Sequence, residues 1–201
     1  HKEYTKTRPD RRLLDWLVME YRLFRYIEDM QFHEKIRQGF SSMEEFLSVA
    51  NSITNRRKSR ASKSLENHLA AIFTGNCLTF DAQVVTEGRK RPDFIFPGSA
   101  AYHDPSFNAQ NLIVLAAKTT CKDRWRQILN EADRVRDKKK YLCTLQQGVS
   151  SKQMQEMLDE NVTLVVPAPY IARYPKAYQK DIMSLQRFID FAKAQEGQRF
   201  T

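Results

Sequence analysis

The chain has 201 residues, of which 33 are Lys or Arg and 24 are Asp or Glu, so its formal net charge is +9. This surplus predicts an anionic partner, and the length fits one domain. The longest uninterrupted apolar run, residues 112–117, is far shorter than the roughly 20 residues of a membrane-spanning helix. Three cysteines without a Cys-x-x-Cys pair and four scattered histidines argue against a disulfide framework and a zinc site. A reducing, intracellular compartment fits this cysteine usage.

The first third of the chain predicts helices. Apolar residues recur at intervals of three and four over residues 13–27, an amphipathic pattern that Gly39 is expected to end. Residues 42–45 have the form of a capping box and predict the start of a second helix. Five cations then fall within residues 55–63, and a third predicted helix ends at residues 75–76.

From about residue 76 the pattern changes to short apolar runs between turn signals. Five of these runs have strand length: 83–85, 94–96, 112–117, 141–145 and 163–166. Three helical patterns follow or separate them: 123–138, 150–160 and 182–192. Helices alternating with strands from residue 112 onward predict crossovers and some parallel pairing. We therefore expect a single domain over residues 1–201, with a helical N-terminal portion to about residue 75 and an α/β core of mixed sheet flanked by helices.

A carboxylate and an ammonium stand at the ends of two of these predicted strands. Asp93 opens the run 94–96, and Lys118 closes the run 112–117. If the two strands are neighbours, both side chains reach one edge of the sheet. A carboxylate beside an ammonium there can hold a divalent metal and position a water, as phosphodiester hydrolysis requires. Taken singly, Asp93 also fits a turn residue and Lys118 the point where a strand meets solvent.

This arrangement resembles the PD-(D/E)xK nucleases, in which an acid usually stands two residues before the lysine. Here that position is Ala116. One restriction-endonuclease subfamily, which reads sites containing CC or CCGG, carries the acid on the following helix instead. The resemblance implies Glu131 in that role and Glu66 as a further carboxylate, with Asp93 completing a Mg²⁺ site. From sequence alone, Glu131 fits a solvated helix residue better than an active-site acid, and for Glu66 the two interpretations are about equal.

The triplet Lys122-Asp123-Arg124 opens the predicted helix that follows Lys118. Aspartate accepts a hydrogen bond from cytosine N4, and arginine pairs with guanine O6 and N7, so the triplet is expected to read C·G pairs. It resembles the basic-x-Asp-Arg element of the same subfamily, one residue tighter. Asp123 is also a good helix N-cap.

With these motifs in this order, the chain is similar over essentially its whole length to the catalytic domains of EcoRII-type restriction endonucleases. The resemblance implies a homodimer of the bacterial cytoplasm that cuts double-stranded DNA at CCWGG with Mg²⁺, before the first C, leaving 5′ overhangs. It also implies a fragment, because the parent proteins carry an N-terminal effector domain for which these residues leave no room.

Other cations and one tyrosine are candidates for further DNA contacts. Arg22 and Tyr26 lie four apart on one helix face and would suit a flipped central base, the alternative being a core-edge tyrosine and an exposed arginine. The basic run is expected to contact phosphates, which positions a protein without specifying sequence, or else is only a solvated face. Its members are Arg56, Arg57, Lys58, Arg60 and Lys63.

Two rival functions fit the same composition. A non-catalytic, sequence-specific DNA-binding module would bind DNA in EDTA and cut nothing. A structure-specific nuclease such as a junction resolvase would cut only branched DNA. Resolvases of this superfamily normally keep the acid two residues before the lysine, so Ala116 disfavours the second rival.

Overall fold

A computed structural model describes residues 8–87, 90–130, 132–135 and 137–197 of the chain. Its centre is a six-stranded mixed sheet in the order β1-β2-β3-β4-β5-β6. The first three strands pair antiparallel and β3 to β6 pair parallel, as the sequence predicts from residue 112 onward. The strands are β1 (Asp81–Ala82), β2 (Phe94–Phe96), β3 (Ile113–Lys118), β4 (Lys140–Thr144), β5 (Val162–Val166) and β6 (Met183–Ser184).

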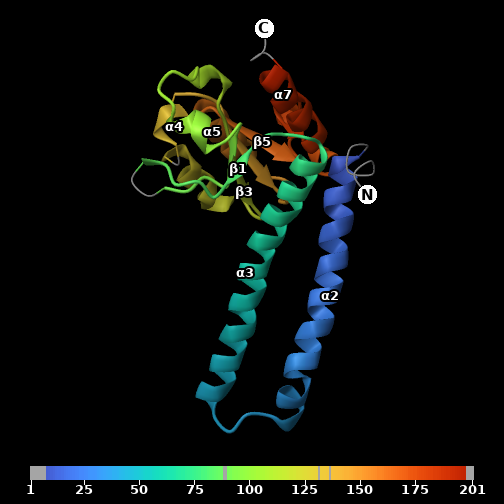
Figure 1. Cartoon of the computed structure of the whole chain (residues 1–201). Coiled ribbons are helices and arrows are strands. Elements are labelled where there is room, and N and C mark those ends of the chain that lie inside the picture. The colour runs from blue at the N-terminus through green and yellow to red at the C-terminus, as the bar shows by residue number, and fades with distance from the viewer. Residues whose placement is uncertain (1–7, 88–89, 131, 136, 198–201) are drawn as a thin grey trace.

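Helices cover both faces of this sheet (Figure 1). Because side chains alternate along a strand, Leu115 and Ala117 of β3 pack with α3 and α7 on one face, while Ala116 packs with η3 and α5 on the other. None of the helices in the described ranges is long and apolar enough to cross a membrane. The α-helices are α2 (Pro9–Gln38), α3 (Met43–Gly75), α4 (Ser99–His103), α5 (Ser151–Asp159), α6 (Ala168–Ile171) and α7 (Leu185–Gly197). The 3-10 helices are η2 (Ala109–Asn111), η3 (Lys122–Asn130), η4 (Asp133–Val135) and η5 (Lys176–Asp181).

The helices α2 and α3 form a long hairpin that projects from the sheet (Figure 1). Gly39 ends α2, and the Ser42 hydroxyl caps α3 by accepting from the Glu45 amide at 3.1 Å, as the sequence predicts. The predicted break after the second helix is wrong, because residues 55–63 lie within α3. Arginine and lysine are good helix formers, so a run of them does not interrupt a helix.

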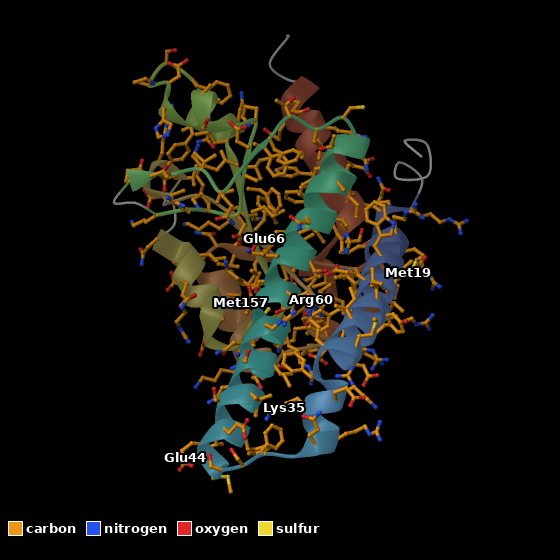
Figure 2. All side chains as sticks on the ribbon, turned by 60° about the horizontal axis from the view of Figure 1, so that its bottom comes forward. Met19, Lys35, Glu44, Arg60, Glu66 and Met157 are labelled. Carbon is orange, nitrogen blue, oxygen red and sulfur yellow. The ribbon has the colours of Figure 1, made fainter. Side chains whose placement is uncertain are left out.

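Ion pairs hold the two arms of the hairpin together. The Arg57 guanidinium donates to both oxygens of Glu28 at 2.8 and 2.6 Å, and this hydrogen bond lowers the pKa of Glu28. Nearer the sheet, Glu20 accepts from Arg60 at 3.3 Å and contacts the His68 ring at 2.8 Å. In Figure 2, Arg60 lies between the two helices.

The distal half of α2 departs from the expected amphipathic pattern. Leu13 is fully buried, whereas Val18, Tyr21 and Ile27, which share its predicted apolar face, are exposed. The reason is geometric: beyond its first turns α2 leaves the sheet and packs on α3 alone, so one side of the helix is uncovered.

Three local predictions in the α/β part are corrected. Residues 83–85 form no strand, because Gln83 adopts a positive φ of 55° directly after the two-residue strand β1. Strand β6 occupies the start of the predicted last helix. The predicted helix 123–138 is instead 3-10 helix, in η3 and η4. Trp125 and Ile128 are nonetheless buried, since a spacing of three suits a 3-10 turn as well as an α-turn.

A single buried carboxylate joins the first helix to the last. Asp10 accepts hydrogen bonds from the backbone amides of Ala168 and Leu185, both at 2.8 Å, and of Gln186 at 3.0 Å. These amides open α6 and α7, where N–H groups have no partner within the helix. Asp10 thereby anchors the root of the hairpin to the far end of the sheet.

We predict that Asp10→Ala destabilises the protein by about 3 kcal/mol, because one buried and two partly buried amides lose a charged acceptor. The melting temperature should fall by about 10 °C. The matched control is Asp15→Ala on the same helix, which removes an exposed ion pair with Arg11 at 3.0 Å. An equal loss of stability in both variants, measured by calorimetry, would contradict the anchoring role.

Candidate active site

The antiparallel register of β2 on β3 brings Asp93 and Lys118 together. Phe94 pairs with Leu115, so Asp93, one residue before β2, lies level with Ala116. The Asp93 Oδ2 atom accepts from the Lys118 ammonium at 2.8 Å and from the Ala117 amide at 2.7 Å. The side chain of Asp93 is 5% exposed and that of Lys118 is 23% exposed. The two residues singled out in the sequence therefore meet where β2 begins and β3 ends, and Lys118 stays partly exposed there.

The long helix α3 adds Glu66 to this pair. The Gln83 amide nitrogen donates to Glu66 Oε2 at 3.2 Å and to Asp93 Oδ1 at 2.9 Å, so it bridges the two carboxylates. The left-handed backbone of Gln83 brings its own N–H to the Asp93 carbonyl at 3.1 Å. Figure 2 shows Glu66 where α3 meets the α/β part.

Sequence reasoning did not find Gln83. It stands in Gln83-Val84-Val85, which has the composition of a strand, and nothing in that run indicates a positive φ. Only the position of β1, which ends at Ala82 and pairs with β2, places the following residue beside Asp93.

Two carboxylates and one ammonium share this half-buried space. Burial raises the pKa of Glu66, and the charge of Asp93 raises it further, whereas Lys118 acts in the opposite direction. Asp93 Oδ2 accepts from two donors, whereas Asp93 Oδ1 and Glu66 Oε2 each accept from the neutral amide of Gln83. Carboxylate oxygens of this kind are the ligands that Mg²⁺ prefers. The donor set therefore fits a hard divalent cation.

The third expected acid does not come from within β3. Ala116, level with Asp93, is 1% exposed and packs in an apolar cluster with Cys121 and Trp125. Glu131, the expected substitute, lies outside the described residues. Within the described ranges, accordingly, no group of three or more acids, histidines or cysteines is placed to hold a metal.

The recognition triplet is described only by its backbone, which opens η3 four residues after Lys118. The side chains of Lys122, Asp123 and Arg124 lie outside the described residues.

The structure divides the basic run of α3 into two groups. Arg57 and Arg60 pair with Glu28 and Glu20 and hold α2 to α3. The others, Arg56, Lys58 and Lys63, are exposed on α3. The Arg56 guanidinium lies 5.6 Å from the centre of the Phe32 ring.

Arg22 and Tyr26 are exposed on α2, and Tyr26 keeps 65% of its surface accessible. Neither contacts Asp93, Lys118 or Glu66 in the structure. Tyr26 therefore does not lie at the edge of the core, whereas Arg22 is exposed as both interpretations predict.

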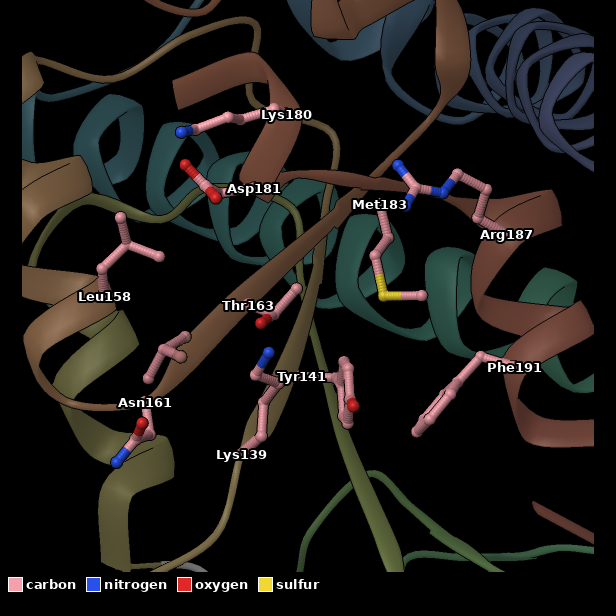
Figure 3. A pocket seen from close by; sticks show the side chains of 11 residues that line it. Lys139, Tyr141, Leu158, Asn161, Thr163, Lys180, Asp181, Met183, Arg187 and Phe191 are labelled. Atoms are coloured by element: carbon pink, nitrogen blue, oxygen red, sulfur yellow. The ribbon is translucent and has the colours of Figure 1, made fainter. Parts of the chain in front are cut away.

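A cavity of about 450 Å³ lies elsewhere, beside the amino-terminal ends of β4 and β5 (Figure 3). Tyr141, Lys180 and Arg187 are among its lining residues. It contains none of the residues singled out above, and it is separated from Lys118 by the length of the parallel strands.

We predict that the raised pKa of Glu66 makes the metal-free protein less stable as pH rises. The folded state binds the Glu66 proton more tightly than the unfolded chain does, so stability falls as pH rises from the ordinary glutamate value of 4.5 through the folded pKa. In EDTA, Glu66→Gln should remove part of this decline and be the more stable protein at pH 8. Melting curves from pH 5 to pH 8 test this, with the exposed Glu160→Gln as control. Parallel curves for wild type and Glu66→Gln would contradict it.

Comparison with known proteins supplies the context for this site. A family profile described as EcoRII C terminal matches residues 24–189. The chain is 50% identical over 182 residues to the type II restriction enzyme EcoRII of Escherichia coli, covering 90% of this chain and 45% of that protein. It is 29% identical over 173 residues to the type II restriction enzyme SsoII of Shigella sonnei, covering 82% and 53%. The chain thus spans about half the length of these relatives.

Solved structures share the fold. Metal-depleted Ecl18kI in complex with uncleaved, modified DNA superposes with a TM-score of 0.82 at 20% identity, covering 97% of this chain and 72% of that one. The complex of the restriction endonuclease PspGI with substrate DNA gives a TM-score of 0.69 at 16% identity, covering 89% and 76%. The mixed sheet with its flanking helices is therefore a restriction-endonuclease-like fold, as the sequence predicts.

Proposed function

The chain belongs to the EcoRII C-terminal family of type II restriction enzymes, and from this premise we propose that it is a Mg²⁺-dependent nuclease that cuts both DNA strands at CCWGG. The observation that carries the proposal is the contact of Asp93 with Lys118 at the end of β3, with Glu66 beside it. Both named structural neighbours are complexes with DNA. The family membership supports cleavage, and the site provides the groups that cleavage needs.

Asp93 and Glu66, together with Glu131, are proposed to hold the Mg²⁺ ion. The assignment of Glu131 follows the family resemblance. When bound, the metal supplies a Lewis acid to the scissile phosphate. Lys118 then serves two purposes: its ammonium fixes the Asp93 carboxylate, and its protons orient the attacking water and stabilise the charge that develops on phosphorus oxygens.

Sequence reading is proposed for Lys122, Asp123 and Arg124. Their segment follows β3 directly, so base contacts and chemistry would be tied to the same strand. A good bidentate contact to a base edge is worth about 1–3 kcal/mol of discrimination. The exposed cations Arg56, Lys58 and Lys63 are proposed to contact phosphates. Arg57 and Arg60 instead form the ion pairs that hold α2 to α3.

Cutting both strands of a near-palindromic site requires two active sites related by a two-fold axis, and hence a homodimer. The odd number of base pairs in CCWGG leaves one pair on that axis. Arg22 and Tyr26 are proposed to stack on its flipped bases, since both are exposed on α2. We also propose that cleavage leaves 5′ overhangs and takes place in the bacterial cytoplasm. The parent protein is proposed to carry an effector domain, because this chain matches only about half the length of EcoRII.

We predict that the protein with Mg²⁺ cuts plasmid DNA at CCWGG and leaves mapped ends before the first C. Lys118→Ala and Glu131→Gln should each lower the cleavage rate by at least about 100-fold, because each removes a group that stabilises the transition state. Both variants should still bind a CCWGG duplex in gel shifts with EDTA. The exposed Glu160→Gln is the control and should cut normally.

The same assay separates the rival functions. Intact DNA under every metal would establish a non-catalytic binding module, and cuts confined to branched DNA would establish a resolvase. Full activity of Glu131→Gln would overturn the assignment of the third acid.

We further predict that 2-aminopurine at the central position of CCWGG brightens when the protein binds, because a flipped base leaves the stack. Tyr26→Ala should reduce this signal. Tyr21→Ala is the control, since Tyr21 is a half-exposed tyrosine on a different side of α2, near the Arg60 guanidinium. Binding without any brightening would contradict base flipping.

A further inference from the structure

The cavity beside the amino-terminal ends of β4 and β5, here named the β4–β5 cavity, has three cations in its lining. Lys139 precedes β4, Lys180 belongs to η5 and Arg187 belongs to α7, and all three residues are exposed. None of these three side chains has an ion-paired or hydrogen-bonded partner within the described part of the chain. The volume of the cavity, about 450 Å³, is typical of small-molecule sites. Unpaired positive charges around such a concave space attract anions.

Two buried residues with hydroxyl groups also line the β4–β5 cavity. Tyr141 of β4 and Thr163 of β5 are paired in the parallel register, so their side chains stand side by side on one face of the sheet. Each residue is only 6% exposed, yet neither hydroxyl has a hydrogen-bond partner among the residues that the structure describes. Buried hydroxyls are normally hydrogen-bonded. The hydrogen bonds of this pair must therefore go to water or to a molecule that enters the cavity.

These cations and hydroxyls together form a donor set for phosphate. Burial raises the pKa of Tyr141 to about 12, so its hydroxyl keeps its proton at neutral pH and can donate to an anion. The Thr163 hydroxyl can donate as well. Figure 3 shows Lys139 and Thr163 between Lys180 on one side and Arg187 on the other. Charge-assisted hydrogen bonds from arginine and lysine are the strongest that proteins make to phosphate oxygens.

The rest of the lining suits the uncharged part of a phosphorylated ligand. Phe191 of α7 packs on the Tyr141 ring with the two ring centroids 5.4 Å apart, and Met183 and Leu158 add apolar surface. Aromatic side chains of this kind stack on planar bases. Asp181 also lines the cavity, and its carboxylate would repel a phosphate but can accept a hydrogen bond from a sugar hydroxyl. Phosphate, sugar and base each find a matching group.

We propose that the β4–β5 cavity binds a nucleoside monophosphate, with its phosphate among the three cations and its base against Phe191. The buried hydroxyls favour a small ligand over duplex DNA. The backbone of a duplex could meet the exposed cations, but it cannot reach hydroxyls on residues that are 6% exposed. The cavity lies at the amino-terminal ends of the parallel strands, whereas Lys118 closes the carboxyl-terminal end of β3. The inference is therefore independent of the proposed cleavage site.

Isothermal titration calorimetry of the purified chain, in EDTA and without DNA, tests the proposal. The probes are adenosine monophosphate, inorganic phosphate and adenosine. Adenosine monophosphate should bind with a submillimolar dissociation constant. Phosphate and adenosine should each bind at least about 10-fold more weakly, because each makes only part of the contacts. Added salt should weaken the binding of adenosine monophosphate, since it screens the exposed cations.

Two variants test the individual contacts. Arg187→Ala should weaken the binding of adenosine monophosphate at least about 10-fold, because charge-assisted hydrogen bonds to the phosphate are lost. Tyr141→Phe keeps the ring that packs on Phe191 and removes only the hydroxyl, so it should weaken binding about 5-fold. The matched control is Lys193→Ala, an exposed cation of α7 outside the cavity, which should bind as wild type does. Melting curves verify that the variants are folded.

Three results would overturn the nucleotide site: no heat of binding with millimolar adenosine monophosphate, undiminished binding by both cavity variants, or an equal loss in the Lys193→Ala control. A duplex without CCWGG that displaces adenosine monophosphate, and that itself binds Arg187→Ala more weakly, would assign the cavity to DNA phosphates instead. Failure of the proposed function has a different signature, because loss of cleavage at CCWGG leaves these titrations unchanged. Arg187→Ala should in turn cut CCWGG DNA at the wild-type rate.

Discussion

The contact between Asp93 and the end of β3 is the constraint on which the site depends. One carboxylate oxygen accepts from a backbone amide of β3 and from the Lys118 ammonium, so its position follows largely from the pairing of β2 with β3. That pairing is itself fixed, because Phe94, Ile95 and Phe96 are all buried and a slip of one residue would turn them to the opposite faces. The core of the protein thereby determines which oxygen atoms are left to meet a cation.

The helix α3 connects the site to the sheet and to α2. Near its end it buries Leu65 and Leu69 against the sheet and presents Glu66 to Asp93, and through its middle it holds α2 by ion pairs. Charged pairs such as Arg57 with Glu28 specify the alignment of the two arms, which an apolar seam alone would leave free to slide. The site and the projecting hairpin are therefore connected by one continuous helix, α3, which is 33 residues long.

The sequence was informative where local pattern and tertiary structure agree, and it failed where contacts between distant segments decide. The buried strands follow from short apolar runs between turn signals, and the start of α3 follows from the capping box that Ser42 opens. The juxtaposition of Asp93 with Lys118 follows from the ends of two strands. Gln83 could not be found, because its place depends on β1 pairing and on a backbone turn with no glycine. The exposed half of α2 was unpredictable for a similar reason: its apolar residues repeat like a core-facing helix, yet the sheet ends before they do.

The charged residues are distributed unevenly between the surface and the site. The cations are not equivalent, because Arg57 and Arg60 are engaged with Glu28 and Glu20. The site at Asp93 carries a local excess of carboxylate, since Glu66 lies beside it. Attraction to a polyanion must then come from the exposed remainder, while the site itself repels phosphate until a cation neutralises it. Such a division separates binding from chemistry: DNA can be held by the surface without metal, and the carboxylates act only on a phosphate that the surface has already brought into place.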